Sequence, residues 1–419
     1  ATARPWPEEY ETAIASVNSF GFGGTNANVV LSEPVSKSIA PESDTSSDDR
    51  VDDTASRSEN SVVPTVLTFS ARSEAALDAL PEGYARALEQ PVADLAEYGA
   101  ASALRRSHHD HRRAVVAADT AEAVDKLRSG DLVTGQVTPG RTGKVAFLFN
   151  GQGPQWYAMG RTLLETSPIY RDKILECDRL ARQYIDWSIY EALTADEESS
   201  PVSRTQYLQP TMFALQVALA ELWKSWGVFP DAVLGHSMGE IAAAHVAGAL
   251  SLSEALKVIC HRARIQDGAD PSGGMMFVAV SEQQARELCA GHPDELWVSA
   301  INSPRASTLS GRRPVLAALA EELDERGIFA RLLRVNCACH SQDMDPLREE
   351  LLEALGEIEH TATRIPLYST LTGARIEGTE LGTDYWWRNF RQPVLFEPAI
   401  RAMLADGYDT FVELSPHPV

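Results

Sequence analysis

Seven residues near the middle of the chain form a turn that could hold a nucleophilic serine: Leu234-Gly235-His236-Ser237-Met238-Gly239-Glu240. They contain the pattern G-x-S-x-G, in which a serine sits on a cramped turn between a strand and a helix. The glycines avoid steric clashes there, and the turn projects the hydroxyl outward. A short apolar run at 232–234 precedes the turn, and an alanine-rich helical pattern at 241–250 follows it. We therefore predict that Ser237 is a nucleophile in acyl chemistry.

A serine hydroxyl needs a general base, and two histidines stand out. His236 adjoins Ser237, but in such a turn its side chain points away from the hydroxyl, so we expect it to be structural. His340 follows a predicted strand at 330–335, and active sites of α/β proteins gather at strand ends. The residues alone explain His340 equally well as a buried, hydrogen-bonded histidine. No acid stands out as its orienting partner, although Asp343 and Asp345 are close in sequence.

Arg262 lies 25 residues after Ser237, in a largely apolar predicted helix. An arginine in such a helix either pairs with a buried acid or binds an anionic ligand. The sequence alone leaves both possibilities open.

The composition argues against several classes of protein. Acidic residues outnumber basic ones by 59 to 37, giving a formal net charge of −22, whereas nucleic-acid-binding proteins normally carry a basic surface. No signal peptide is visible, and no apolar run reaches the ~18–20 residues that a membrane helix needs. We expect a cytoplasmic protein that binds neither nucleic acid nor membranes.

The five cysteines are odd in number, and their spacing fits no disulfide framework, which indicates a reducing compartment. Cys337 and Cys339 form a C-x-C pattern without a second pair of ligands nearby, so we expect no metal site. The remaining cysteines are Cys177, Cys260 and Cys289.

The central and C-terminal parts predict an α/β fold. The apolar run 145–149 is typical of a strand buried on both faces, and the alternation of strands and helices after it indicates a parallel sheet. Residues 276–335 follow the order β-α-β-β-α-β, which is ferredoxin-like, so we expect a small inserted lobe. A strand at 365–369, a helix at 398–405 and a strand at 410–414 close the chain.

The first 140 residues fall into three segments of different composition. A glycine-rich segment within 12–31 is better explained as a tight turn between two strands than as a phosphate loop, because no Gly-Lys-Ser/Thr follows. Residues 32–61 are rich in Ser, Asp, Glu and Pro and predict a mobile linker. Residues 62–140 predict a folded α/β packing module. From the residues at its two termini, we expect the chain to be a piece cut from a longer polypeptide.

A set of motifs resembles one family. The motifs are Gly151-Gln152-Gly153-Pro154-Gln155-Trp156, Gln209-Pro210, the serine turn, Arg262, Cys337-Ala338-Cys339-His340 and the closing Ser-Pro-His-Pro-Val. In order and spacing they resemble the acyltransferase domains of modular polyketide synthases, within the malonyl-CoA:acyl-carrier-protein transacylase family. The resemblance implies a large α/β-hydrolase-like subdomain with a parallel sheet and an inserted ferredoxin-like small subdomain, preceded by a small α/β linker domain.

The resemblance also implies domain boundaries. Residues 1–33 are similar to the C-terminal end of a ketosynthase, 34–61 form the mobile linker and 62–143 the folded linker between ketosynthase and acyltransferase. Residues 144–419 form the acyltransferase, with the ferredoxin-like subdomain at about 275–335. The usual N-A-H of the ketosynthase segment is N-A-N here, with Asn28 in place of the histidine. This segment holds no condensing residue, so we expect no ketosynthase activity.

The roles of the site residues follow from the resemblance. Ser237 would attack an acyl-CoA thioester, with His340 as base and then acid, oriented by a backbone carbonyl. The backbone N–H groups of Gln152 and Met238 would form the oxyanion hole, and Arg262 would bind the free carboxylate of a malonyl-type group. The remaining substrate-binding residues would be Gln209, Asn302, Cys337 and Cys339. An acyl carrier protein would supply the phosphopantetheine thiol, and no bound cofactor or metal is expected.

The four residues ending at His340 bear on the choice of acyl group. In the family H-A-F-H accompanies malonyl and Y-A-S-H methylmalonyl, whereas this chain has C-A-C-H. Small residues at Cys337 and Cys339 enlarge the space beside the acyl α-carbon, which favours an α-substituted malonyl group with substituents larger than methyl. Met238 favours malonyl, because methylmalonyl-specific members often carry Gln there.

Three alternatives remain at this stage. The acyltransferase could be specific for malonyl or methylmalonyl. A serine hydrolase or thioesterase shares the serine turn but does not explain Arg262, the G-Q-G-P-Q loop or the inserted lobe. A non-catalytic scaffold fragment predicts that Ser237 is never acylated.

Overall fold

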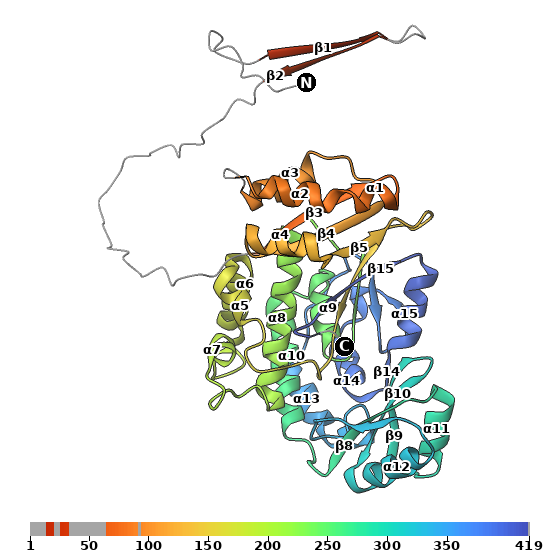
Figure 1. Ribbon diagram of the computed structural model, residues 1–419. Coiled ribbons are helices and arrows are strands. Elements are labelled where there is room, and N and C mark those ends of the chain that lie inside the picture. The colour runs from red at the N-terminus through yellow and green to blue at the C-terminus, as the bar shows by residue number, and fades with distance from the viewer. Residues whose placement is uncertain (1–13, 21–25, 33–63, 91–93, 418–419) are drawn as a thin grey trace, which may run out of the picture. The chain divides into compact units, whose positions relative to one another are not determined.

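The computed structural model describes residues 14–20, 26–32, 64–90 and 94–417 (Figure 1). The chain divides into two compact units, 1–59 and 60–419. In the first unit β1 (Ile14–Phe20) pairs antiparallel with β2 (Asn26–Ser32). The turn predicted between these strands and the linker predicted at 34–61 lie outside the described residues.

A small α/β layer structure begins the second unit. Its sheet has the order β3-β4-β5 and is antiparallel: β3 (Thr65–Ala71), β4 (His111–Ala117) and β5 (Val133–Gln136). Leu67 and Phe69 of β3 lie two residues apart and so share one face, and they pack in one buried core with Val115 of β4. Its four helices are α1 (Glu74–Asp78), α2 (Leu80–Leu88), α3 (Leu95–Leu104) and α4 (Thr120–Ser129). The sequence analysis missed β5 because all four of its residues are exposed.

The large sheet has the order β13-β12-β7-β6-β15 and is parallel except at β13. Its strands are β6 (Val145–Phe149), β7 (Ala232–Gly235), β12 (Leu367–Ser369), β13 (Ala374–Ile376) and β15 (Thr410–Leu414). Phe147, Phe149 and Val233 enter the main core. Ala146 and Leu234 enter a second core with residues of α15. The sheet is thus buried on both faces, which explains the continuous apolar run of β6.

Helices of the second unit surround this sheet (Figure 1). They are α5 (Arg161–Thr166), α6 (Pro168–Ala181), α7 (Ile189–Thr194), α8 (Thr205–Ser225), α9 (Gly239–Val246), α10 (Leu252–Asp267), α13 (Arg348–Leu355), α14 (Thr383–Arg391) and α15 (Phe396–Ala405), with 3-10 turns η1 (Gln342–Leu347) and η2 (Gly378–Glu380). Among the described residues, no helix is both long and apolar enough to span a bilayer.

The inserted lobe has its own sheet, in the order β11-β8-β10-β9-β14. Its elements are β8 (Gly273–Val278), α11 (Glu282–Ala290), β9 (Leu296–Ser303), β10 (Ala306–Arg312), α12 (Arg313–Glu325) and β11 (Ala330–Leu332). The first four strands in sheet order are antiparallel, so the predicted ferredoxin-like arrangement is confirmed. The two-residue strand β14 (Val394–Leu395) adds to β9 in parallel; it is too short to leave a sequence pattern.

Candidate active site

The serine turn joins β7 to α9 and is too crowded for side chains at either glycine. A Cβ on Gly235 would lie 2.1 Å from the backbone nitrogen of Glu240, and one on Gly239 would lie 2.1 Å from the carbonyl oxygen of Phe149. Ser237 has a φ of 54°, in the left-handed region that non-glycine residues rarely adopt. Such backbone strain clusters at functional sites. The structure therefore gives a physical reason for each fixed position of G-x-S-x-G.

The loop after β6 lies directly over this turn, because β6 and β7 are parallel neighbours and their carboxyl ends meet. A Cβ on Gly151 would lie 3.0 Å from Nδ1 of His236 and 3.7 Å from the Cβ of Ser237. A side chain at this position would force the His236 ring or the backbone beside it to shift. In the described part of the chain, the backbone N–H groups of Gln152 and Met238 donate to no protein acceptor. Both groups are therefore available for an oxyanion.

His340 reaches Ser237 from the loop that follows β11. Its Nε2 lies 2.7 Å from Oγ of Ser237, and its Nδ1 lies 2.9 Å from the carbonyl oxygen of Gln392. A carbonyl only accepts, so Nδ1 carries the proton and Nε2 is free to accept the proton of Ser237. Asp345 pairs with Arg391 instead, at 2.6 Å, so the orienting group is the backbone of Gln392.

Burial sets the protonation state of this histidine. His340 is only 4% exposed. Burial, and then the nearby charge of Arg262, lower the pKa of His340 to about 3. The imidazole is therefore neutral near pH 7 and able to act as a base. Its φ of 58° shows a second residue of the site in the left-handed region.

Arg262 points from α10 at the serine. Its Nη2 donates to Oγ of Ser237 at 2.9 Å, and its Nη1 donates to Oδ1 of Asn389 at 2.6 Å. The side chain is 4% exposed and its Nε has no hydrogen-bond partner among the described residues. Burial lowers the pKa of Arg262 to about 10, while the charge of Glu240 opposes this shift. The guanidinium is therefore charged near neutral pH, yet no carboxylate of the described residues forms an ion pair with it.

The predicted structural role of His236 agrees with its contacts. Its Nε2 lies 3.1 Å from Oδ1 of Asn302, whose Nδ2 donates to Oγ1 of Thr308 at 2.9 Å. Both ends of the Asn302 amide thus contact protein groups, so its predicted contact with substrate stays a prediction.

Gln209 and the two cysteines meet through a residue that the sequence analysis missed. Gln266, one turn after Arg262 on α10, accepts from Nε2 of Gln209 at 2.9 Å. Its own Nε2 contacts Sγ of Cys339 at 3.2 Å and of Cys337 at 3.6 Å. Because Gln266 is 7% exposed, this contact lies in the protein interior.

One expectation about the cysteines is wrong. The structure joins Cys337 and Cys339 in a disulfide, whereas their number and spacing had argued against any such bond. Their Cα atoms lie 5.3 Å apart, within the range that disulfides span, because the intervening Ala338 turns the chain back. The cysteine count therefore no longer supports a reducing compartment.

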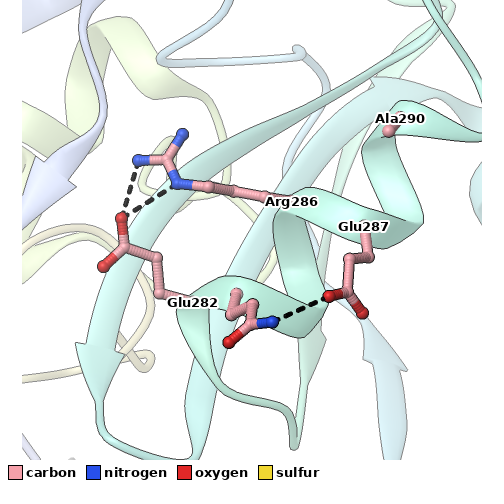
Figure 2. A pocket seen from close by; sticks show the side chains of 5 residues that line it. Glu282, Arg286, Glu287 and Ala290 are labelled. Carbon is pink, nitrogen blue, oxygen red and sulfur yellow. Dashed lines mark hydrogen bonds and ion pairs between the residues drawn. The ribbon is translucent and has the colours of Figure 1, made fainter.

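A hollow of about 440 Å³ lies on the exposed side of α11, away from these residues (Figure 2). Its polar side chains pair with one another: Arg286 with Glu282 at 2.7 Å, and Gln283 with Glu287 at 3.0 Å. None of the predicted site residues lines it, so it is not the site of the chemistry inferred above.

Comparison with known proteins places this geometry in a family. Residues 146–419 match the model of the acyl transferase domain, and residues 1–116 match that of the ketoacyl-synthetase C-terminal extension. The chain belongs to the acyl transferase domain family. The second match overlaps both the segment assigned to the ketosynthase end and the predicted folded linker.

Similar curated proteins are polyketide synthases. The chain is 41% identical over 427 residues to erythronolide synthase EryA2 of Saccharopolyspora erythraea, covering 99% of the chain and 11% of that protein. It is 38% identical over 437 residues to polyketide synthase GfsB of Streptomyces halstedii, covering 100% of the chain and 8% of that protein. The chain thus spans about a tenth of the length of these relatives.

Similar solved structures are acyltransferase domains. One is the acyltransferase domain from module 8 of the salinomycin polyketide synthase, with 35% identity and a TM-score of 0.81, covering 85% of this chain and 86% of that one. Another is the acyl transferase domain of SpnD in complex with 2-(pent-4-yn-1-yl)malonyl, with 32% identity and a TM-score of 0.74, covering 84% of each chain. These matches confirm the predicted fold class, transferase activity and resemblance to polyketide-synthase acyltransferases.

Proposed function

We propose that this domain selects an extender unit for polyketide synthesis: it moves a malonyl-type group from CoA to Ser237 and then to the phosphopantetheine thiol of an acyl carrier protein. The observation that carries this proposal is a buried, charged arginine that donates to the serine hydroxyl and forms no ion pair with a carboxylate of the described residues. Such a group favours an acyl chain that ends in a carboxylate.

The first half-reaction forms an ester on Ser237. Oγ attacks the thioester carbonyl carbon while its proton moves to Nε2 of His340. The oxyanion is stabilised by the backbone N–H groups of Gln152 and Met238. The C–S bond then breaks, and the CoA thiolate receives the proton from His340. The 2.7 Å contact between Oγ and Nε2 supports this transfer.

The second half-reaction reverses these steps with another thiol. His340 takes the proton of the phosphopantetheine thiol, whose sulfur attacks the ester carbon of acylated Ser237. The C–O bond breaks and Oγ regains the proton. The two thiols use the site in turn, so the kinetics are ping-pong. The chain needs no resident cofactor or metal for these steps.

The acyl group that we propose is an α-substituted malonyl group, including alkyl substituents larger than methyl. Cys337 and Cys339 stand where bulkier residues occur in H-A-F-H members, and neither position carries an aromatic ring. The similar SpnD domain was solved in complex with 2-(pent-4-yn-1-yl)malonyl, an alkyl-substituted malonyl group. We expect Gln209 and Asn302 to contact this acyl group as well.

The partners that we propose are acyl-CoA, an acyl carrier protein and the neighbouring domains of a longer cytoplasmic synthase. We also keep the domain boundaries predicted above, with the acyltransferase at 144–419 and the folded linker at 62–143.

Acyl-enzyme lifetime tests the proposal. The full chain is first loaded with an alkylmalonyl-CoA, freed of CoA, and then incubated in buffer with and without a carrier protein. We expect a persistent acyl-enzyme that discharges only when the carrier thiol is added. Rapid loss in buffer alone would identify a hydrolase instead, and failure to load would identify a scaffold. Ser237→Ala is the control.

A further inference from the structure

Arg262 is held by a neutral amide, which is itself held by a buried carboxylate. Oδ1 of Asn389 accepts from Nη1 of Arg262 at 2.6 Å. Nδ2 of the same amide donates to Oε2 of Glu240 at 3.3 Å and to the carbonyl oxygen of Ser237 at 3.4 Å. Asn389 is 3% exposed, so water cannot replace these partners.

Glu240 is fixed by donors from two segments, the turn after β12 and helix α14. It lies in the first turn of α9, directly after the serine turn. Its Oε2 accepts from the backbone nitrogen and Oγ1 of Thr370 at 3.0 and 2.8 Å, and its Oε1 accepts from the hydroxyl of Tyr385 on α14. The side chain is fully buried. Burial raises the pKa of Glu240, whereas the donors around it favour the ionised form.

This arrangement keeps a carboxylate close to Arg262 without letting it occupy the guanidinium. A carboxylate in contact would use the paired N–H groups that an acyl carboxylate must bind. The amide of Asn389 uses Nη1 alone. Nε has no partner among the described residues, and Nη2 contacts only the hydroxyl of Ser237. Nε is thus a buried donor that no group of the described residues satisfies, and an acyl carboxylate beside Ser237 would satisfy it together with Nη2.

We propose that Asn389 and Glu240 are positioning residues that hold Arg262 with its Nε–Nη2 edge unpaired by a protein carboxylate, and thereby make the site select acyl groups bearing a carboxylate. The amide stands between the buried carboxyl group of Glu240 and the guanidinium, and it passes the orientation of the first to the second. This inference rests on the proposed function, and it assigns the substrate edge of the arginine and the residues that set it.

The test exchanges the carboxyl group at position 240 and the amide at position 389, so that a carboxylate instead of an amide contacts Arg262. The double variant Glu240→Gln with Asn389→Asp keeps the net charge but places a carboxylate against Nη1. We expect kcat/KM for an alkylmalonyl-CoA, relative to an uncharged acyl-CoA of the same length, to fall at least about 100-fold. Glu240→Gln alone, which leaves the amide against Arg262, should lower this ratio much less.

Tyr385→Phe is the matched control, since it removes one donor to Glu240 but leaves Asn389 and Arg262 in contact. It should slow all acyl substrates equally and keep their ratio. If the double variant does not fold, Asn389→Ser provides the second test: it cannot reach both partners. We expect it to raise KM for the alkylmalonyl-CoA about tenfold with little change for the uncharged acyl-CoA.

The outcomes separate this inference from the proposed function. Wild-type protein that loads neither substrate contradicts the proposed function. Wild-type protein that prefers the alkylmalonyl-CoA, with an unchanged ratio in the folded double variant or in Asn389→Ser, contradicts the positioning role alone. A fall in the ratio for the double variant, with Tyr385→Phe unaffected, supports it.

Discussion

Replacing Arg262 by alanine should change which acyl groups load onto Ser237. The guanidinium is 4% exposed and donates to Oγ of Ser237 and to Asn389. Its removal takes away both N–H groups that would bind an acyl carboxylate and leaves that carboxylate buried without a counter-charge.

The size of the effect follows from the two lost contacts. Hydrogen bonds to charged groups contribute about 1.5–3 kcal/mol each, so two of them amount to about 3–6 kcal/mol. Since about 1.4 kcal/mol is a factor of ten, kcat/KM for malonyl-type substrates should fall about 10²–10⁴-fold. Uncharged acyl-CoAs should load as well or better, because they no longer bury an unpaired arginine.

The assay is a competition between a malonyl-type and an uncharged acyl-CoA, scored by the mass added to the protein. Arg262→Lys, which keeps the charge but not the two-pronged geometry, should lie between wild type and alanine. Unchanged selectivity in a folded Arg262→Ala protein would refute the assignment of the carboxylate to this arginine. A second readout is independent of binding: since the charge of Arg262 lowers the pKa of His340, its removal should move the acid limb of the loading rate to higher pH.

Three further predictions follow from the same geometry. Gly239→Ala forces a Cβ to within 2.1 Å of the Phe149 carbonyl oxygen and should lower the free energy of unfolding by about 1–3 kcal/mol or more. The control Gly83→Ala lies in α2, where nothing lies within 4 Å, and should raise the free energy of unfolding by about 0.5–1 kcal/mol. Equal effects of the two variants in denaturant titrations would contradict the argument that Gly239 is crowded. Cys339→Phe should shift preference from alkylmalonyl-CoA to malonyl-CoA in a substrate panel, whereas Cys339→Ser, which breaks the disulfide without filling space, should not; a shift in both would assign the effect to the disulfide. With the pKa of His340 lowered to about 3, the loading rate should stay constant as pH falls from 7 to about 5, because the free imidazole remains the neutral base; a decline beginning near pH 6.5 would show an unperturbed histidine.

Local patterns predicted the parts of the fold that depend on few residues. The serine turn needs only glycines at two crowded positions, so a motif of a few residues is enough to predict its geometry. The ferredoxin-like order of the inserted lobe follows from alternating elements whose cores are local. Strand β5 and the two-residue β14 could not be predicted, because exposed or very short strands show no periodicity.

The sequence predicted the residues at the centre of the site but not those that hold them. Asn389 and Glu240 are 149 positions apart and meet only when α14 packs beside the start of α9. Glu240 was visible in the quoted motif, and its burial was the missing signal. The same reason hid Gln266, and it also hid the carbonyl of Gln392, since any residue could supply a backbone acceptor. The disulfide was missed because counting cysteines tests for sets of disulfides that join distant segments of a chain. It does not test for a bond between two cysteines that are separated by a single residue.

The mass added to Ser237 tests the central claim most directly. The full chain is exposed to an equimolar mixture of malonyl-, methylmalonyl-, longer alkylmalonyl- and acetyl-CoA, digested, and the modified peptide identified by mass spectrometry. We predict one modification, on the peptide that contains Ser237, with the mass of an alkylmalonyl group. An acetyl group on Ser237, an acyl group on another residue, or an unmodified protein would contradict the account.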